Sequence, residues 1–179
     1  LSLDPGLARI RTLSRAKLGA HQLDWARAAG AEVRTGSPVR SIDFEARTLE
    51  ADGRRIRYRH LIGADGSRST VRRALGLESP RVFFAGEYNI PGLRLEQLVV
   101  ACDSDALGSG YFWIFPHVDY TCIGAGGHKQ LVAPATVRPY LHRRMEAIGV
   151  DPGETEYEGA TIEVHFVGFD FPNGVHLVG

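Results

Sequence analysis

Apolar residues at helical spacing predict two long helices in the chain. In residues 14–29, Leu18, Trp25 and Ala29 recur at i, i+7 and i+11 and therefore share one face. Ser14 is a favourable N-cap residue, and Gly30 stands where a C-terminal glycine is preferred. A second helix is expected over residues 134–148, because proline in the first turn precedes an apolar stripe and glycine follows it. The stripe consists of Val137, Leu141, Met145 and Ile148.

Alternating or short apolar runs predict strands in the rest of the chain. Residues 39–44 alternate, and Asp52-Gly53, a strong hairpin signal, stands between two short runs. Residues 60–64 form a short strand that a turn and a short helix at 70–75 follow. The remaining strand candidates are 31–34, 48–51, 54–58, 82–84, 98–101, 111–115, 120–123, 160–166 and 175–179. The four candidates from 82 to 123 suit an antiparallel sheet, so the fold class is predicted to be α+β.

Composition narrows the class of protein. The 179 residues are 44% hydrophobic and 23% charged, which is ordinary for a globular chain with its own core. The 21 basic and 21 acidic residues balance, which argues against nucleic acid as a partner because nucleic acid favours a basic surface. Two cysteines exclude a disulfide framework, and no apolar run reaches the roughly 18 residues of a transmembrane helix. The chain begins at Leu1 without a signal-peptide pattern, so a cytoplasmic piece of a longer protein is expected.

Residues 61–72 hold the most informative chemistry in the sequence. They predict a strand, a tight turn and a helix start, whose free backbone amides favour a phosphate group. Gly63 and Gly66 let the backbone approach a ligand closely. Asp65, at the carboxyl edge of the strand, is placed to accept hydrogen bonds from ribose hydroxyls or to order a water at a pyrophosphate, and Arg72 adds positive charge. From the residues alone, an ordinary strand–helix corner with Asp65 as a turn residue is an equal alternative.

The same stretch resembles the Asp-Gly motif of FAD-dependent enzymes built like the aromatic hydroxylases. That motif reads Gly-Ala-Asp-Gly-x-x-Ser-x-Val-Arg, and its fixed positions are present as Gly63, Ala64, Asp65, Gly66, Ser69, Val71 and Arg72. The resemblance implies contact with the pyrophosphate region of FAD, and in some members with a reduced nicotinamide cofactor.

Two neighbouring segments support the resemblance. The family has an arginine near the flavin at the start of the preceding helix, and Arg15 holds that place, although Leu18-Gly19 replaces the usual Phe-Asp pair. Residues 176–179 resemble the strand that leads into the family's Gly-Asp flavin motif. The cofactor-binding residues that the resemblance implies are Arg15, Gly63, Asp65, Gly66 and Arg72.

A second stretch indicates the subfamily. Residues 110–116 and the glycine-rich residues 122–127 are similar to the Tyr-x-Trp-x-Phe-Pro…Val-Gly-x-Gly stretch of geranylgeranyl reductases, with His117 in place of the family's lysine. Flavin halogenases carry Trp-x-Trp-x-Ile-Pro in this region, and the chain has Tyr and Phe at two of those places. A halogenase is therefore a less favoured interpretation than a reductase, and a hydroxylase is ranked beside the halogenase.

The aromatic residues of this stretch are the candidate substrate-binding residues. In a strand, Tyr111, Trp113 and Phe115 share one face, and this face, together with Pro116, is expected to line a cavity for a lipid-like substrate. The alternative is that the aromatic face packs in the core of a sandwich.

These resemblances imply part of a two-domain flavoprotein. Residues 1–78 would complete the FAD-binding domain with its β-meander, residues 79–170 would form a substrate domain, and residues 171–179 would return to the FAD-binding domain. The parent protein would use FAD, with NAD(P)H or ferredoxin as electron donor, to reduce an isoprenoid-like or other apolar double bond. Peripheral contact with a membrane is compatible with such a substrate. The family's N-terminal glycine-rich loop lies outside this sequence, so the chain alone is expected to bind FAD weakly and to be inactive.

Two alternatives to the reductase stay open. One is a flavin-dependent monooxygenase or halogenase acting on a small aromatic, and the other is a non-enzymatic lipid- or protein-binding domain. No catalytic acid or base is assigned, because the flavin itself carries the hydride chemistry. The seven histidines show no metal-ligand spacing, so no metal site is expected.

Overall fold

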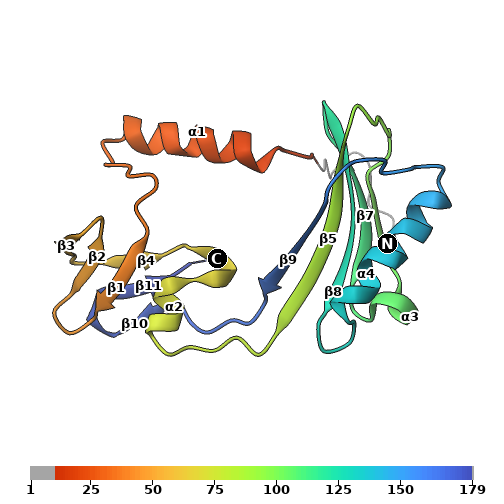
Figure 1. Cartoon of the computed structure of the whole chain (residues 1–179). Helices are drawn as coiled ribbons and strands as arrows, with labels where there is room; N and C mark the ends of the chain where they lie inside the picture. The colour runs from red at the N-terminus through yellow and green to blue at the C-terminus, as the bar shows by residue number, and fades with distance from the viewer. Residues whose placement is uncertain (1–10, 179) are drawn as a thin grey trace, which may run out of the picture. The chain divides into compact units, whose positions relative to one another are not determined.

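The computed structural model describes residues 11–178 and confirms the α+β class (Figure 1). Contacts divide the chain into two compact units. The first holds the described residues up to Val33 together with Ala85–Ala160, and the second holds Arg34–Phe84 and the described residues from Thr161 onward. The predicted division into a cofactor-binding and a substrate domain, with boundaries at residues 78 and 170, is based on function and stays a prediction. The outermost residues of the predicted cofactor-binding domain, 1–10 and Gly179, lie outside the described part of the chain.

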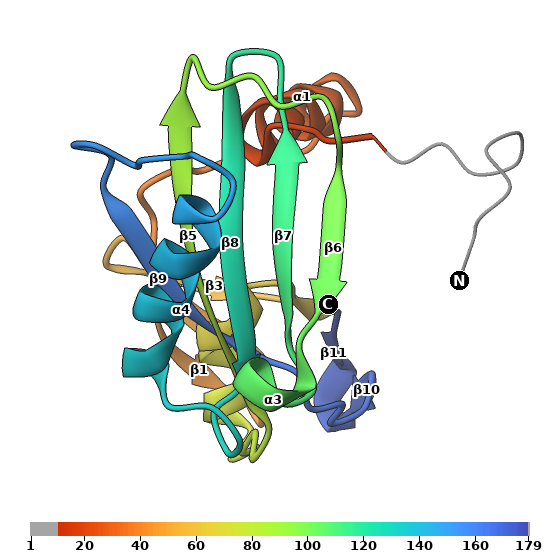
Figure 2. The same ribbon diagram turned by 90° about the vertical axis from the view of Figure 1, so that its right-hand side faces the viewer.

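A five-stranded sheet in the order β6-β7-β8-β5-β9 forms the frame of the first unit (Figure 2). Its strands are β5 (Val82–Pro91), β6 (Val99–Cys102), β7 (Tyr111–Pro116), β8 (Tyr120–His128) and β9 (Tyr157–Glu163). Strand β7 pairs antiparallel with both β6 and β8. The predicted antiparallel sheet is confirmed, but β5 runs seven residues beyond the predicted end at Phe84.

Helix α4 (Pro134–Glu146) lies across one face of this sheet (Figure 2). Three residues of its predicted stripe, Val137, Leu141 and Met145, are fully buried, whereas Ile148 lies beyond the helix and is exposed. The short helix α3 (Ser104–Leu107) precedes β7 and was not predicted. Asp103 caps it by accepting a hydrogen bond from the amide of Ala106 at 3.1 Å.

Helix α1 (Arg15–Ala28) confirms the first predicted helix, and the Ser14 hydroxyl caps it by accepting from the amide of Lys17. The expected apolar face is not buried in the described part of the chain: no residue of α1 is buried, and Trp25 is 64% exposed. The strand predicted at residues 31–34 is wrong, because the structure has irregular backbone there.

The second unit contains two three-stranded sheets. The first is a meander of β1 (Val39–Asp43), β2 (Thr48–Ala51) and β3 (Arg54–Arg57). At its predicted hairpin turn Asp52 and Gly53 both adopt positive φ, 54° and 66°, as that turn requires.

The second of these sheets has the order β10-β11-β4. Its strand β4 leads into the turn of residues 64–69, which is called the motif corner below. The strands of this sheet are β4 (Leu61–Gly63), β10 (Asp170–Phe171) and β11 (Val175–Leu177), and β4 pairs parallel with β11. The short helix α2 (Thr70–Ala74) packs on it, with Val71, Val175 and Leu177 at the centre of the local core. No helix within residues 11–178 has the length and apolar character that crossing a membrane requires.

Candidate functional site

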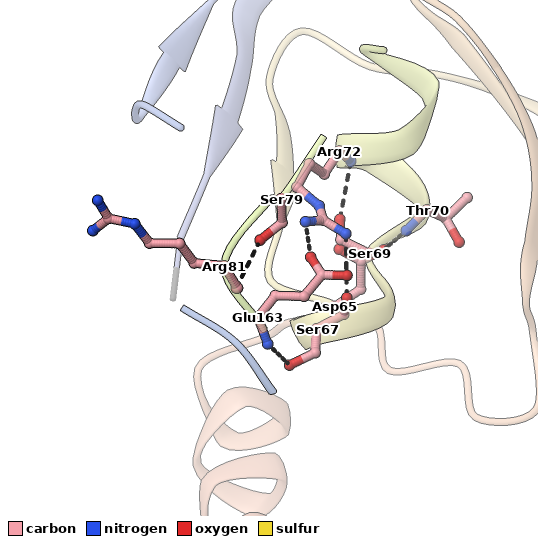
Figure 3. A network of polar contacts seen from close by, with 8 residues as sticks. All are labelled: Asp65, Ser67, Ser69, Thr70, Arg72, Ser79, Arg81 and Glu163. Carbon is pink, nitrogen blue, oxygen red and sulfur yellow. Dashed lines mark hydrogen bonds and ion pairs between the residues drawn. The ribbon is translucent and has the colours of Figure 1, made fainter. Parts of the chain in front are cut away.

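The motif corner is a turn between β4 and α2 that Asp65 holds together (Figure 3). One carboxylate oxygen of Asp65, Oδ2, accepts hydrogen bonds from the amides of Thr70, at 2.6 Å, and Val71, at 3.4 Å. The Ser69 hydroxyl caps α2 by accepting from the amide of Arg72 at 3.0 Å. The amides of Thr70, Val71 and Arg72 at the start of α2 are therefore used by the chain itself.

Asp65 is held in its ionised form. Partial burial alone would raise the pKa of this carboxyl, but the hydrogen bonds from the Ser69 hydroxyl and from the amides of Thr70 and Val71 outweigh burial and lower it below 3.8. The side chain still lines a pocket beside the turn, so it has not turned away from the place where the motif predicts a ligand.

Gly63 and Gly66 serve the corner for different reasons. A Cβ on Gly63 would lie 2.7 Å from Leu177 Cδ2 and 2.9 Å from Val71 Cβ, so only glycine lets β4 approach its neighbours. Gly66 has a φ of 71°, in the left-handed region, and a Cβ there would meet no atom within 4 Å. Gly66 thus leaves an open backbone position on the pocket wall.

Arg72 reaches from α2 into the same pocket (Figure 3). Its guanidinium forms an ion pair with Glu163 and donates a hydrogen bond to the carbonyl oxygen of Ser67 at 3.2 Å. The Ser67 hydroxyl in turn accepts from the amide of Glu163 at 3.2 Å. The Arg72 side chain is 12% exposed, and its Nε is buried without a hydrogen-bond partner in residues 11–178. The guanidinium therefore keeps a donor for a further acceptor.

The pocket at this corner has a volume of about 260 Å³ and lies wholly in the second unit. Its walls come from the turn and from the segment that leads to β10. The lining comprises Gly63, Asp65, Gly66, Ser67, Ser69, Arg72, Ile162, Glu163, His165, Phe166, Val167, Gly168, Phe169, Leu177 and Val178. The pocket therefore presents the Arg72 guanidinium, with its unused Nε donor, beside the open backbone at Gly66 and the carboxylates of Asp65 and Glu163.

Arg15, the remaining predicted cofactor residue, belongs to the first unit. It is the first residue of α1 and lines a cavity of about 630 Å³ that Phe115 also lines. The four other predicted cofactor residues meet at the corner pocket, so the structure brings four of the five together.

Strand β7 separates a core face from an open face. Phe112 and Ile114 are buried on the face toward α4, where the Arg144 guanidinium lies 4.8 Å from the centre of the Phe112 ring. On the other face the ring of Trp113 lies 5.5 Å from that of Tyr111 and 6.1 Å from that of Phe115. The predicted aromatic row is present.

Members of the aromatic row have different environments. Trp113 is only 6% exposed, and a Cβ at Gly124 would overlap its indole, so Trp113 is packed against β8. Tyr111 is 38% exposed. Phe115 lines the 630 Å³ cavity, and Pro116 lines a neighbouring cavity of about 530 Å³.

The larger cavity also contains polar groups that sequence reasoning missed. Glu87 and Asn89 on β5 and Glu158 on β9 line it, together with Cys122 on β8. The sequence signal for Glu87 and Asn89 was the alternation of residues 86–90, which lies beyond the predicted end of β5 at Phe84. The full lining is Arg11, Thr12, Leu13, Ser14, Arg15, Ala16, Glu87, Asn89, Leu98, Phe115, His117, Tyr120, Cys122 and Glu158.

No protein-family model matches the chain. Among curated proteins, an uncharacterised protein of Methanosarcina barkeri is 28% identical over 152 residues, which cover 80% of this chain and 39% of that protein. Rifampicin monooxygenase of Streptomyces venezuelae is 43% identical over 58 residues, 31% of this chain and 12% of the monooxygenase.

Solved structures show that the fold is that of FAD-dependent oxidoreductases. A geranylgeranyl bacteriochlorophyll reductase-like protein from Thermoplasma acidophilum matches 92% of this chain and 46% of its own, with a TM-score of 0.75 and 24% identity. Anhydrotetracycline hydroxylase from Streptomyces rimosus matches 93% and 36%, with a TM-score of 0.61 and 22% identity. Tryptophan 6-halogenase from Streptomyces toxytricini matches 92% and 34%, with a TM-score of 0.70 and 15% identity. The chain spans less than half the length of each.

Proposed function

We propose that this chain, which has the fold of FAD-dependent oxidoreductases, is the part of such an enzyme that holds the FAD pyrophosphate at the Asp65 corner and binds substrate on the sheet of the first unit. The observation that carries the proposal is the buried Arg72 guanidinium with an unused Nε donor in a pocket that Asp65 also lines. Its planar set of N–H donors and its delocalised charge make a guanidinium a favoured partner of phosphate.

Each residue of the corner has a distinct role in this proposal. Arg72 would bind the pyrophosphate, and Gly66 would let the ligand approach the backbone. Asp65 would keep the turn in shape, because its ionised carboxylate ties the turn to the start of α2. Arg15, which lines the larger cavity with Phe115, is the residue that the family resemblance assigns to the flavin. FAD itself supplies the transfer of a hydride or of two electrons when bound.

The reaction that we favour is reduction of an isoprenoid-like or other apolar double bond, with electrons from NAD(P)H or ferredoxin. It is supported by the aromatic row on β7, by the cavity that Phe115 lines, and by the likeness to a geranylgeranyl bacteriochlorophyll reductase-like protein. We also propose a cytoplasmic location, with which the free thiols of Cys102 and Cys122 agree.

A flavin-dependent monooxygenase is the second candidate. The observation in its favour is the 43% identity to rifampicin monooxygenase over 58 residues, the highest identity among the proteins compared above. That likeness covers 31% of the chain. Mixing the reduced protein with oxygen and substrate separates the two candidates, because a monooxygenase would oxygenate its substrate as oxygen is consumed, whereas a reductase would be reoxidised slowly and would give no oxygenated product.

Flavin content tests the proposal as a whole. In protein produced from the complete reading frame, Arg72→Gln should lower FAD affinity about tenfold or more, because a charged hydrogen bond to phosphate is lost. Arg73→Gln is the matched control, since Arg73 is exposed on the same helix and bonds to Thr70. Equal flavin content in the two variants, or a wild-type protein without flavin, would favour a non-enzymatic binding domain.

A further inference from the structure

Strand β5 presents different chemistry on its two faces. Tyr88 and Ile90 point toward the core and are 1% and 9% exposed. Glu87 and Asn89 alternate with them and line the 630 Å³ cavity on the opposite face. Glu158 comes to the same cavity from β9. A short polar row, formed by Glu87, Asn89 and Glu158, therefore lines the cavity that Phe115 of β7 also lines.

Hydrogen bonds connect the side chains of this row. The Asn89 side-chain amide donates to Glu87 Oε1 at 3.5 Å and to Glu158 Oε1 at 3.4 Å. The Cys122 thiol donates to the second oxygen of Glu87, Oε2, at 3.1 Å. A single amide thus separates two carboxylates, each of which can accept more hydrogen bonds than these contacts supply.

The pKa of the Cys122 thiol shows how this wall affects a negative charge. Burial, and after it the hydrogen bond and charge of Glu87 and the charge of Glu158, raise the pKa of this thiol to about 12, against the donated bond from Trp113. Tyr120 follows the same trend, because burial first and then the charges of Cys122 and Glu87 raise its pKa. A negative charge is thus disfavoured at the wall formed by β5, β8 and β9.

The rest of the cavity is mostly apolar or aromatic. Phe115 and Leu98 line it, and the rings of His117 and Tyr120 stack with their centres 4.2 Å apart. Arg11 and Arg15 belong to the segment of residues 11–16, which contributes a separate part of the lining. Opposite charges therefore occur on different parts of the lining, with the carboxylates on the sheet.

We infer that this cavity selects a substrate whose apolar body carries a hydrogen-bond donor, a hydroxyl or a protonated amine, and that Glu87 and Glu158 accept from that donor. A substrate whose polar end is a carboxylate or phosphate is disfavoured at the same place, because it would add a third negative charge beside two carboxylates. The inference rests on the proposed function, since it takes this cavity as the substrate site, and it narrows the substrate class within it.

Three probes of one shape test the inference. They are 4-phenylbutylamine, 4-phenylbutan-1-ol and 4-phenylbutanoate, which share a body and differ in the charge and donor at one end. Binding to the 179-residue chain is followed by the fluorescence of Trp113, whose indole donates to Cys122 at 3.4 Å. All proteins carry Trp25→Phe, because Trp25 is the second tryptophan of the chain and is exposed.

The amine should bind about tenfold more tightly than the carboxylate, with the alcohol between them, as expected for one charged hydrogen bond. In the double variant Glu87→Gln, Glu158→Gln, which keeps the shape of both side chains, this preference should fall to about twofold or less. Glu156→Gln is the control, because Glu156 is exposed and is not part of the cavity lining. It should leave the preference unchanged.

Three results would overturn the inference: a carboxylate that binds as tightly as the amine, a preference that survives in the double variant, or no binding of any probe. Circular dichroism of each variant shows whether the fold is kept, and the single variants replace the double variant where it is not. Flavin binding by Arg72→Gln is measured separately at the corner pocket. A failure of the proposed cofactor site is therefore distinguished from a failure of this inference.

Discussion

The indole nitrogen of Trp113 donates a hydrogen bond to the sulfur of Cys122 across β7 and β8, at 3.4 Å. Both side chains are buried, and Gly124 makes room for the indole. The tryptophan is therefore a packed part of the sheet, and Phe115 is the member of the row that meets the larger cavity.

Trp113→Ala should lower the free energy of unfolding by about 3–5 kcal/mol, because a large buried side chain leaves a cavity behind. Tyr111→Ala, in the same row but more than a third exposed, should cost about 1 kcal/mol or less. Chemical denaturation of the two variants measures both effects. Equal losses would show that the two rings are packed alike.

Asp65→Ala should destabilise the corner at neutral pH by about 1 kcal/mol, the usual cost of losing a capping carboxylate. The pKa of Asp65 is lowered in the folded protein, so its stabilising effect is complete above the unfolded value of 3.8. The effect is lost as pH falls through the lower folded value. The stability gap between wild type and variant should thus be constant from pH 7 to about pH 5 and close below 3.8. A gap that widens on acidification would contradict the assigned sign.

Gly63→Ala should lower the free energy of unfolding by about 1–3 kcal/mol, because the added methyl group would overlap Leu177 and Val71. Gly19→Ala is the counterpart, since Gly19 lies inside α1 and a Cβ there meets no atom within 4 Å. This substitution should stabilise α1 by about 1 kcal/mol, because alanine has a higher helix propensity than glycine. Far-ultraviolet circular dichroism with denaturation follows both changes, and a tolerated Gly63→Ala would show that β4 and β11 can separate.

The two cysteines should react with iodoacetamide at very different rates. Cys102 is exposed, whereas Cys122 is buried and has a pKa of about 12, so little reactive thiolate forms at pH 8. Mass spectrometry of the native chain should show Cys102 modified first. Glu87→Gln should lower the pKa of Cys122 and speed its modification, while Cys102 serves as the internal control. An unchanged rate at Cys122 would mean that burial alone protects it.

Local sequence patterns correctly predicted the elements whose structure depends on residues close in the sequence. The Asp52-Gly53 hairpin and the core stripe of α4 follow from turn chemistry and helical spacing, and both are present. The corner was also anticipated in its position, with Asp65 and Arg72 on one pocket. The sequence could not reveal that Asp65 accepts hydrogen bonds from the amides of Thr70 and Val71. Ser69 is an equally favourable capping residue, so the pattern alone does not decide between the two side chains.

Contacts between distant segments account for the errors. In residues 31–34 only Val33 is a strongly β-forming residue, and the structure has irregular backbone there. Ion pairing of Arg72 with Glu163 joins residues 91 positions apart, which no local pattern reveals. The polar row was missed because β5 was ended too early, before the alternation of Glu87, Tyr88 and Asn89 could be recognised.

The alternation along β5 makes this strand intolerant of insertions. A single extra residue before Glu87 would rotate every later side chain to the opposite side of the sheet. Glu87 and Asn89 would then enter the space under α4, and the ring of Tyr88 would enter the cavity. One added codon would thus damage folding and ligand preference together, so natural variation in this strand should proceed by substitution rather than by change of length.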